Sequence, residues 1–213
     1  MLLFGTLAIM LAVGYTQHNS GLFSSCAMLV KVFLAGLIAF GFWEPIADAL
    51  DPSLRTTFLA GCEDMIVLTL LFGVSLFVLR LTTNYLAPEM IVEHGALQHL
   101  GAGVVGMVTG YFVAGFLICV LQTLPLDVHF MDFGPREANE PAYRPIYPPD
   151  RVWLSLMRHA GAMPFRWKEE NPTFDLEGTF ELRYLRYRRS TEERGPMPYF
   201  HEFDRELGRY KDR

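Results

Sequence analysis

Long apolar stretches alternate with short polar connectors over the first 126 residues of the chain. Three of them, residues 22–43, 59–81 and 101–124, are each long enough as a helix to cross the roughly 30 Å hydrocarbon core of a bilayer, at ~1.5 Å per residue. A fourth stretch, residues 1–15, is short for a span, and we expect it to be retained as a first helix, not cleaved as a signal peptide. The pattern predicts an all-α integral membrane fold with four transmembrane helices in residues 1–126.

The connectors predict where these helices end. Trp43 closes the second stretch, at the place where an aromatic side chain commonly anchors a helix at the membrane interface. Glu44 and Pro45 follow, and proline removes a helical hydrogen bond, so we expect the helix to stop there. Residues 44–57 and 82–100 are then predicted to be polar connectors.

The last apolar stretch carries glycines on one side. Gly103, Gly106 and Gly110 are spaced three and four residues apart, and Gly101 lies just before them. A helix would therefore present a groove in which another helix can approach closely, and these four glycines are the predicted packing residues. The same glycines fit the nucleotide-binding pattern G-x-G-x-x-G, and Asp127 lies about twenty residues beyond the pattern. That motif requires a preceding strand in a soluble βαβ unit, whereas here the glycines open an apolar run. The context favours helix packing.

Charged residues are sparse before residue 127, with three basic against seven acidic residues, and dense after it, with fifteen against sixteen. The predicted membrane charges are Lys31, Glu63, Asp64 and Arg80. Charges near a helix end can reach the headgroups, so we expect an interfacial role for Glu63 and Asp64, with a proton relay as the alternative. Lys31 and Arg80 favour a cytoplasmic first and third connector, which would place both termini outside.

The polar half divides into a Pro-rich linker, residues 127–149, and a tail, residues 150–213, that we expect to be extracytoplasmic. Asp150 can cap a helix that runs to about His159. One side of this helix carries apolar side chains that need a partner, and the possible tail contacts are Trp153, Leu156 and Met157. The membrane interface, the four-helix part and another protein remain open, with packing inside the chain as the default. The pattern in residues 171–189 fits both a strand and a helix.

Composition and motifs exclude several functions. Neither half is a basic surface, so no nucleic-acid partner is expected. His94 and His99 are five residues apart without a completing ligand, which predicts no metal site. No G-x-S-x-G or comparable motif supplies a nucleophile, and no cofactor motif survives its context. We therefore expect no catalytic residues, no enzyme activity and no cofactor.

The membrane half resembles the colicin V production protein family of bacterial inner-membrane proteins. The resemblance covers about residues 1–126 and lies in four short-looped spans and three motifs, which are Gly14-Tyr15 with Gly21-Leu22-Phe23, Trp43-Glu44-Pro45, and Leu97-Gln98-His99-Leu100-Gly101-Ala102-Gly103. It implies a multi-pass protein of the bacterial inner membrane with a role in export, toxin production or envelope homeostasis. Some relatives carry a periplasmic domain after the fourth span, which implies a periplasmic tail.

The combined expectation is a non-catalytic scaffold or partner-recruiting subunit. Its partners would be the lipid bilayer and either a membrane or envelope protein or further copies of the chain. The alternative is a small transporter or channel subunit in which Lys31, Glu63, Asp64 or Arg80 lines a charged path through the membrane.

Overall fold

The computed structural model describes residues 2–54, 61–86, 95–124, 126, 148–162, 180–185, 188, 203–204 and 209–210. Its helices are α1 (Leu2–His18), α2 (Leu22–Leu54), α3 (Glu63–Leu86), α4 (Ala96–Gln122) and α5 (Pro149–Ala162). Residues 180–185 are also helical. Two short strands, β1 (Phe203–Asp204) and β2 (Arg209–Tyr210), form an antiparallel pair. Apart from this pair, every described element is a helix, as the all-α prediction requires.

Three helices have the length and composition needed to cross a membrane: α2 over its first 29 residues, α3 and nearly all of α4. The fourth apolar helix, α1, has 17 residues. Its length of about 25 Å falls short of a typical hydrocarbon core. The chain therefore has an all-α membrane fold with three long apolar helices and one short one.

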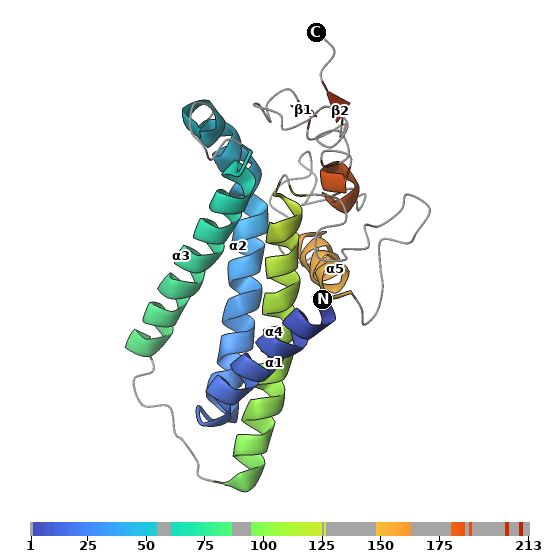
Figure 1. Ribbon diagram of the computed structural model, residues 1–213. Coiled ribbons are helices and arrows are strands. Elements are labelled where there is room, and N and C mark those ends of the chain that lie inside the picture. The colour runs from blue at the N-terminus through green and yellow to red at the C-terminus, as the bar shows by residue number, and fades with distance from the viewer. Residues whose placement is uncertain are drawn as a thin grey trace.

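The three long helices run side by side, with α2 between α3 and α4 (Figure 1). We call the end at which α2 and α4 finish and α3 begins the upper end, and the opposite end the lower end. Glycines in the left-handed region turn the chain between helices, at Gly21 after α1 (φ 79°) and at Gly61 before α3 (φ 84°). Residues with a Cβ are strained at such φ values, so both turns depend on glycine.

The short helices α1 and α5 both pack against α4. Figure 1 shows α1 crossing the lower half of α4, whereas α5 lies along its upper half. The tail segment around residues 180–185 lies above α5, beside the upper end. The described helical parts of the polar half, α5 and residues 180–185, thus pack directly on the membrane helices.

The prediction that Pro45 stops the second helix is wrong, because α2 continues to Leu54. Figure 1 shows the last turns of α2 leaning away from its lower part. A helix accommodates an internal proline by bending, because the lost hydrogen bond and the ring both act at a single turn. Ala47 beyond the bend is fully buried in the core, so packing stabilises the continued helix.

Two other predicted helix boundaries differ from those in the structure. The predicted connector, residues 82–100, is shorter in the structure. Helix α3 extends into it as far as Leu86, and α4 begins inside it at Ala96. Asp150 does not cap α5 but lies in its first turn, because the helix begins one residue earlier, at Pro149. Most of the predicted linker, residues 127–147, and the tail segment 163–179 lie outside the described residues.

Candidate functional site: the docked tail

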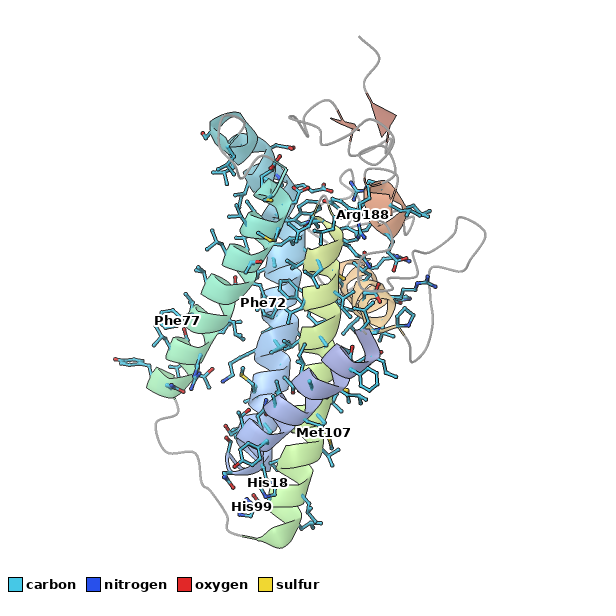
Figure 2. The ribbon with its side chains drawn as sticks, viewed as in Figure 1. His18, Phe72, Phe77, His99, Met107 and Arg188 are labelled. Carbon is cyan, nitrogen blue, oxygen red and sulfur yellow. The ribbon has the colours of Figure 1, made fainter. Side chains whose placement is uncertain are left out.

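The tail residues that the structure describes near the upper end form one unit with the membrane helices. We call α5, together with residues 180–185 and 188, the docked tail. Its side chains contact α2, α3 and α4 through an apolar seat and a set of buried polar bonds. Figure 2 shows Arg188 at the upper end of the bundle, far from the lower end where His18 and His99 lie.

Trp153 anchors α5 in a notch between α2 and α4. Its side chain is fully buried, and a Cβ added at Gly36 of α2 would overlap its indole ring. A Cβ at Gly115 of α4 would lie 3.0 Å from the Cβ of Trp153 and equally close to the carbonyl carbon of Pro149. The notch therefore exists because both wall positions lack a side chain, and a large indole fills it.

Aromatic rings extend this apolar contact toward the upper end of the bundle. Phe180 contacts the rings of Phe40 and Trp43 edge to face, with centroids 5.9 and 6.1 Å apart. Tyr184 lies 4.9 Å from Phe180 and 6.4 Å from Trp43. Such pairs contribute about 0.5–1.5 kcal/mol each beyond the area that they bury. Trp43 is fully buried beneath them, so the prediction that it faces the membrane interface is wrong: the tail covers it.

Hydrogen bonds tie the docked tail to the upper ends of α2 and α3. The Tyr184 hydroxyl donates to Asp64 Oδ2 at 2.9 Å, and both residues are buried. Asp64 and its neighbour Glu63 occupy the first turn of α3, where carboxylates interact favourably with the helix dipole. At the surface Arg183 Nη1 donates to Glu44 Oε1 at 3.1 Å. This second pair is half exposed on the Glu44 side and contributes less.

The upper end of α4 is bonded on two sides by the docked tail. Arg188 donates to the backbone carbonyl of Gln122 at 3.1 Å, which satisfies one of the acceptors left unpaired at a helix C-terminus. The Gln122 side chain donates to Asp150 Oδ2 at 2.6 Å. Within the tail, Arg151 and Glu181 form a buried ion pair at 3.7 Å. Polar contacts thus join three described segments: α4, α5 and the tail helix residues Glu181 and Arg188.

Asp150 is a carboxyl group buried by this arrangement, which disfavours its charged form. Burial raises the pKa of its carboxyl above the ordinary value, because a charged carboxylate loses its water shell there. Hydrogen bonds from backbone amides, the charge of Arg151 and the Gln122 side chain oppose the shift without cancelling it. The neutral form is therefore favoured in the folded state relative to the unfolded one.

The glycine positions of α4 lie against α1 of the same chain. A Cβ at Gly106 would come within 2.9 Å of the Cα of Gly14, and one at Gly110 within 2.7 Å of the Cα of Met10. Gly101 faces Leu22 at 3.2 Å, and Gly103 faces His18 at 3.5 Å. Figure 2 places Met107 at this crossing. The groove is thus filled within the chain, and other copies would have to bind elsewhere.

The four membrane charges separate into two groups. Glu63 and Asp64 are buried at the upper end, where Asp64 accepts the hydrogen bond from the docked tail. Lys31 of α2 is partly buried and Arg80 of α3 is exposed, and the two are close enough for the charge of Arg80 to act on Lys31. Along α3 the acidic pair and Arg80 are sixteen or more residues apart, which corresponds to about 24 Å. The structure does not bring the four together.

Among the residues that the structure describes, the other chemistry-bearing side chains form no catalytic set. In α5 the Nδ1 atom of His159 lies 3.4 Å from Ser155 Oγ but 2.7 Å from the Ser155 carbonyl oxygen. A carbonyl oxygen can only accept a hydrogen bond, so the closer contact requires Nδ1 to carry the proton. This nitrogen then cannot act as a base toward the hydroxyl. His99 contacts the carbonyl of His18 at 3.0 Å, while His94 lies outside the described residues. The described residues contain no group of three or more metal-ligating side chains.

The docked tail partly matches the possible contacts read from the sequence. Trp153 and Met157 are buried, and Leu156 packs partly buried against the same core, so all three face this chain's own helices. Glu44, Gln122 and Asp150 were missed as site residues. Their only signal in the sequence is their place at the ends of predicted helices, which many unrelated residues share. Comparisons with protein-family models, curated proteins and solved structures gave no significant match.

Proposed function

We propose that the protein is a non-catalytic, multi-pass membrane scaffold that holds its tail in a fixed pose for a partner. It resembles colicin V production proteins, and we propose the corresponding role in export, toxin production or envelope homeostasis. It would reside in the bacterial inner membrane with the tail on the periplasmic side. The membrane helices would serve as the platform.

The docked tail is the observation that carries this proposal. A tail that served only as a tether would need no specific seat, whereas here Trp153 fills a notch and Tyr184 bonds a buried carboxylate. Because these contacts are buried, they fix the orientation of α5 and of residues 180–185 relative to the membrane helices. A partner would meet the outward side of α5, where His159 is exposed.

The test uses intact bacterial cells and the full-length chain. A reporter fused after Arg213 and protease shaving would locate the tail. Deletion of the gene should impair toxin export or make the envelope sensitive to detergent, and the wild-type chain should restore the function. A chain carrying Tyr184→Phe and Arg188→Gln, which weakens docking, should restore it poorly, while Tyr85→Phe, an exposed site at the lower end of α3, should restore it fully.

Two results would contradict the proposal. A tail found on the cytoplasmic side would reverse the topology. Full rescue by the weakened-docking chain, present at wild-type amounts in the membrane, would mean that the fixed tail is not what the function requires.

The second candidate is a small transporter or channel subunit. The observation in its favour is that the spanning helices carry Lys31, Glu63, Asp64 and Arg80. The separation of about 24 Å along α3 counts against one continuous charged path. Ion flux into proteoliposomes that disappears on Glu63→Gln and Asp64→Asn would favour the transporter, and sealed vesicles would favour the scaffold.

A further inference from the structure

Two basic residues, Lys31 of α2 and Arg80 of α3, lie in the lower half of the membrane bundle, close enough for the charge of one to act on the other. Lys31 is nine residues from the lower end of α2 at Leu22, and Arg80 is six residues from the lower end of α3 at Leu86. At ~1.5 Å per residue these positions lie about 13 and 9 Å from the helix ends. The charge of Arg80 acts on Lys31, so the two cations repel each other. An anion bound nearby would relieve this repulsion.

No protein anion of the described chain lies at that depth. The structure gives neither Lys31 nor Arg80 an ion pair or hydrogen bond through its side chain within the described residues. The described acidic side chains of α2 and α3 all belong to the opposite, upper end, where they are Glu44, Asp48, Glu63 and Asp64. The counter-charge must therefore come from outside this part of the chain.

The surface around the two cations is apolar and uncovered. The residues of α3 that are buried all lie between Glu63 and Phe72, and Figure 1 shows the lower half of this helix diverging from α2. Its side chains there are largely exposed, with Phe77 at 62% and Leu81 at 52%. On α2, Val30 next to Lys31 is 55% exposed. An anion with apolar chains fits this combination.

We propose that Lys31 and Arg80 bind the phosphate headgroup of an anionic phospholipid in the seam between α2 and the lower half of α3. The acyl chains lie along the exposed apolar side chains of the two helices. The Arg80 guanidinium offers paired donors that match phosphate oxygens, and the Lys31 ammonium supplies a second charge. Both reach toward the lower headgroup layer by extending their side chains.

A second copy of the chain fits this seam less well. Copies inserted in the same direction have their described acidic side chains at the upper end, about 20 Å or more from Arg80 along the helix axis. The acidic side chains that the structure describes in such a copy therefore cannot supply a carboxylate at the required depth. A lipid headgroup comes from the layer that the two side chains already approach. Basic clusters beside membrane helices recognise anionic lipids in this way.

The experiment measures lipid retention by native mass spectrometry of the full-length protein in mild detergent. The probes are phosphatidylglycerol, phosphatidylcholine and inorganic phosphate. Wild-type protein should retain phosphatidylglycerol in preference to phosphatidylcholine. Lys31→Met and Arg80→Met should each weaken that preference about fivefold and together about thirtyfold, since one basic side chain near an anionic surface contributes about that factor. Arg209→Gln in β2 is the basic control and should change nothing.

Charge-conserving variants separate binding from folding. The pair Lys31→Arg with Arg80→Lys keeps both cations and should keep the preference. The proposal is overturned if the double Met variant retains phosphatidylglycerol as wild type does, or if wild type shows no preference over phosphatidylcholine. Displacement of phosphatidylglycerol by millimolar inorganic phosphate would also overturn it, because the site would then serve a small anion. Loss of a dimer in the Met variants, without a lipid preference, would assign the seam to a second copy.

Discussion

Replacing Gly106 by alanine should loosen α1 from α4. A Cβ at this position would meet Gly14 Cα at 2.9 Å, Gln17 Cβ at 3.0 Å and the Val13 carbonyl oxygen at 3.1 Å. All three belong to the backbone or to the first side-chain atom of α1, so no flexible side chain can move aside. The helix must shift as a whole.

The magnitude follows from two opposing effects. Overpacking of a tight contact costs about 1–3 kcal/mol. Alanine is better than glycine in a helix by about 0.5–1 kcal/mol, which offsets part of that cost. The net loss is then about 1 kcal/mol, and for a chain of this size it lowers the Tm by about 2–4 °C.

Thermal unfolding of the full-length protein in mild detergent, followed by circular dichroism, measures this effect. The matched control is Gly73→Ala in α3, where an added Cβ would meet nothing within 4 Å. The control should keep or raise the Tm, because it gains helix propensity without a clash. Equal shifts for the two variants would refute the reasoning, since α1 would then not lie against Gly106.

Three further changes test the docked tail. Tyr184→Phe removes a buried hydrogen bond to a carboxylate, worth about 1.5–3 kcal/mol, and should speed tryptic cleavage after Arg183 by tenfold or more, as measured by mass spectrometry of the fragments. Gly36→Ala should lower the Tm by more than Gly106→Ala, because its Cβ would overlap the fully buried indole ring; an equal or smaller shift would count against the notch. Asp150→Asn should raise stability at neutral pH, because it removes a buried charge. The folded-state pKa of Asp150 lies above its ordinary value of 3.8. Protonation of Asp150 therefore stabilises the wild type fully below pH 3.8, and this stabilisation is lost as the pH rises through the folded-state pKa. The Tm difference between this variant and wild type should therefore widen with pH, and a constant difference would contradict the burial of the charge.

The helices of the membrane half were largely predictable because lipid imposes a simple rule. Each span must be a long apolar helix, and such runs stand out in the sequence. The end of α2 was not predictable in this way. Proline at position 45 is a local stop signal, but the buried Ala47 beyond it makes contacts that the local signal does not reveal. Tertiary packing outweighed the local preference.

The tail shows a second limit. The stripe through Trp153 and Met157 predicts which side of α5 is buried, but the notch that receives it depends on glycines more than 35 residues away in the chain. The ambiguity between strand and helix in residues 171–189 is settled for 180–185, which are helical. Phe180 and Tyr184 lie on one side four residues apart, and both are buried. The alternating pattern with Leu182 was coincidental.

The polar network was the least predictable feature. Tyr184 and Asp64 are 120 residues apart, and neither belongs to a recognisable motif. Their pairing requires that α3 begins beside the tail helix, which follows only from the packing of whole helices. A single sequence carries no signal for such a pair.

A double-mutant cycle on Tyr184 and Asp64 tests most directly whether buried bonds hold the tail on the membrane helices. Tyr184→Phe, Asp64→Ala and the double variant would be compared with wild type by the rate of tryptic cleavage after Arg183 in the full-length protein. If the hydrogen bond exists, the double variant should open hardly more than the more damaging single variant, with a coupling energy of about 1–3 kcal/mol. Effects that simply multiply would show that the two residues act independently, and would contradict the docked tail.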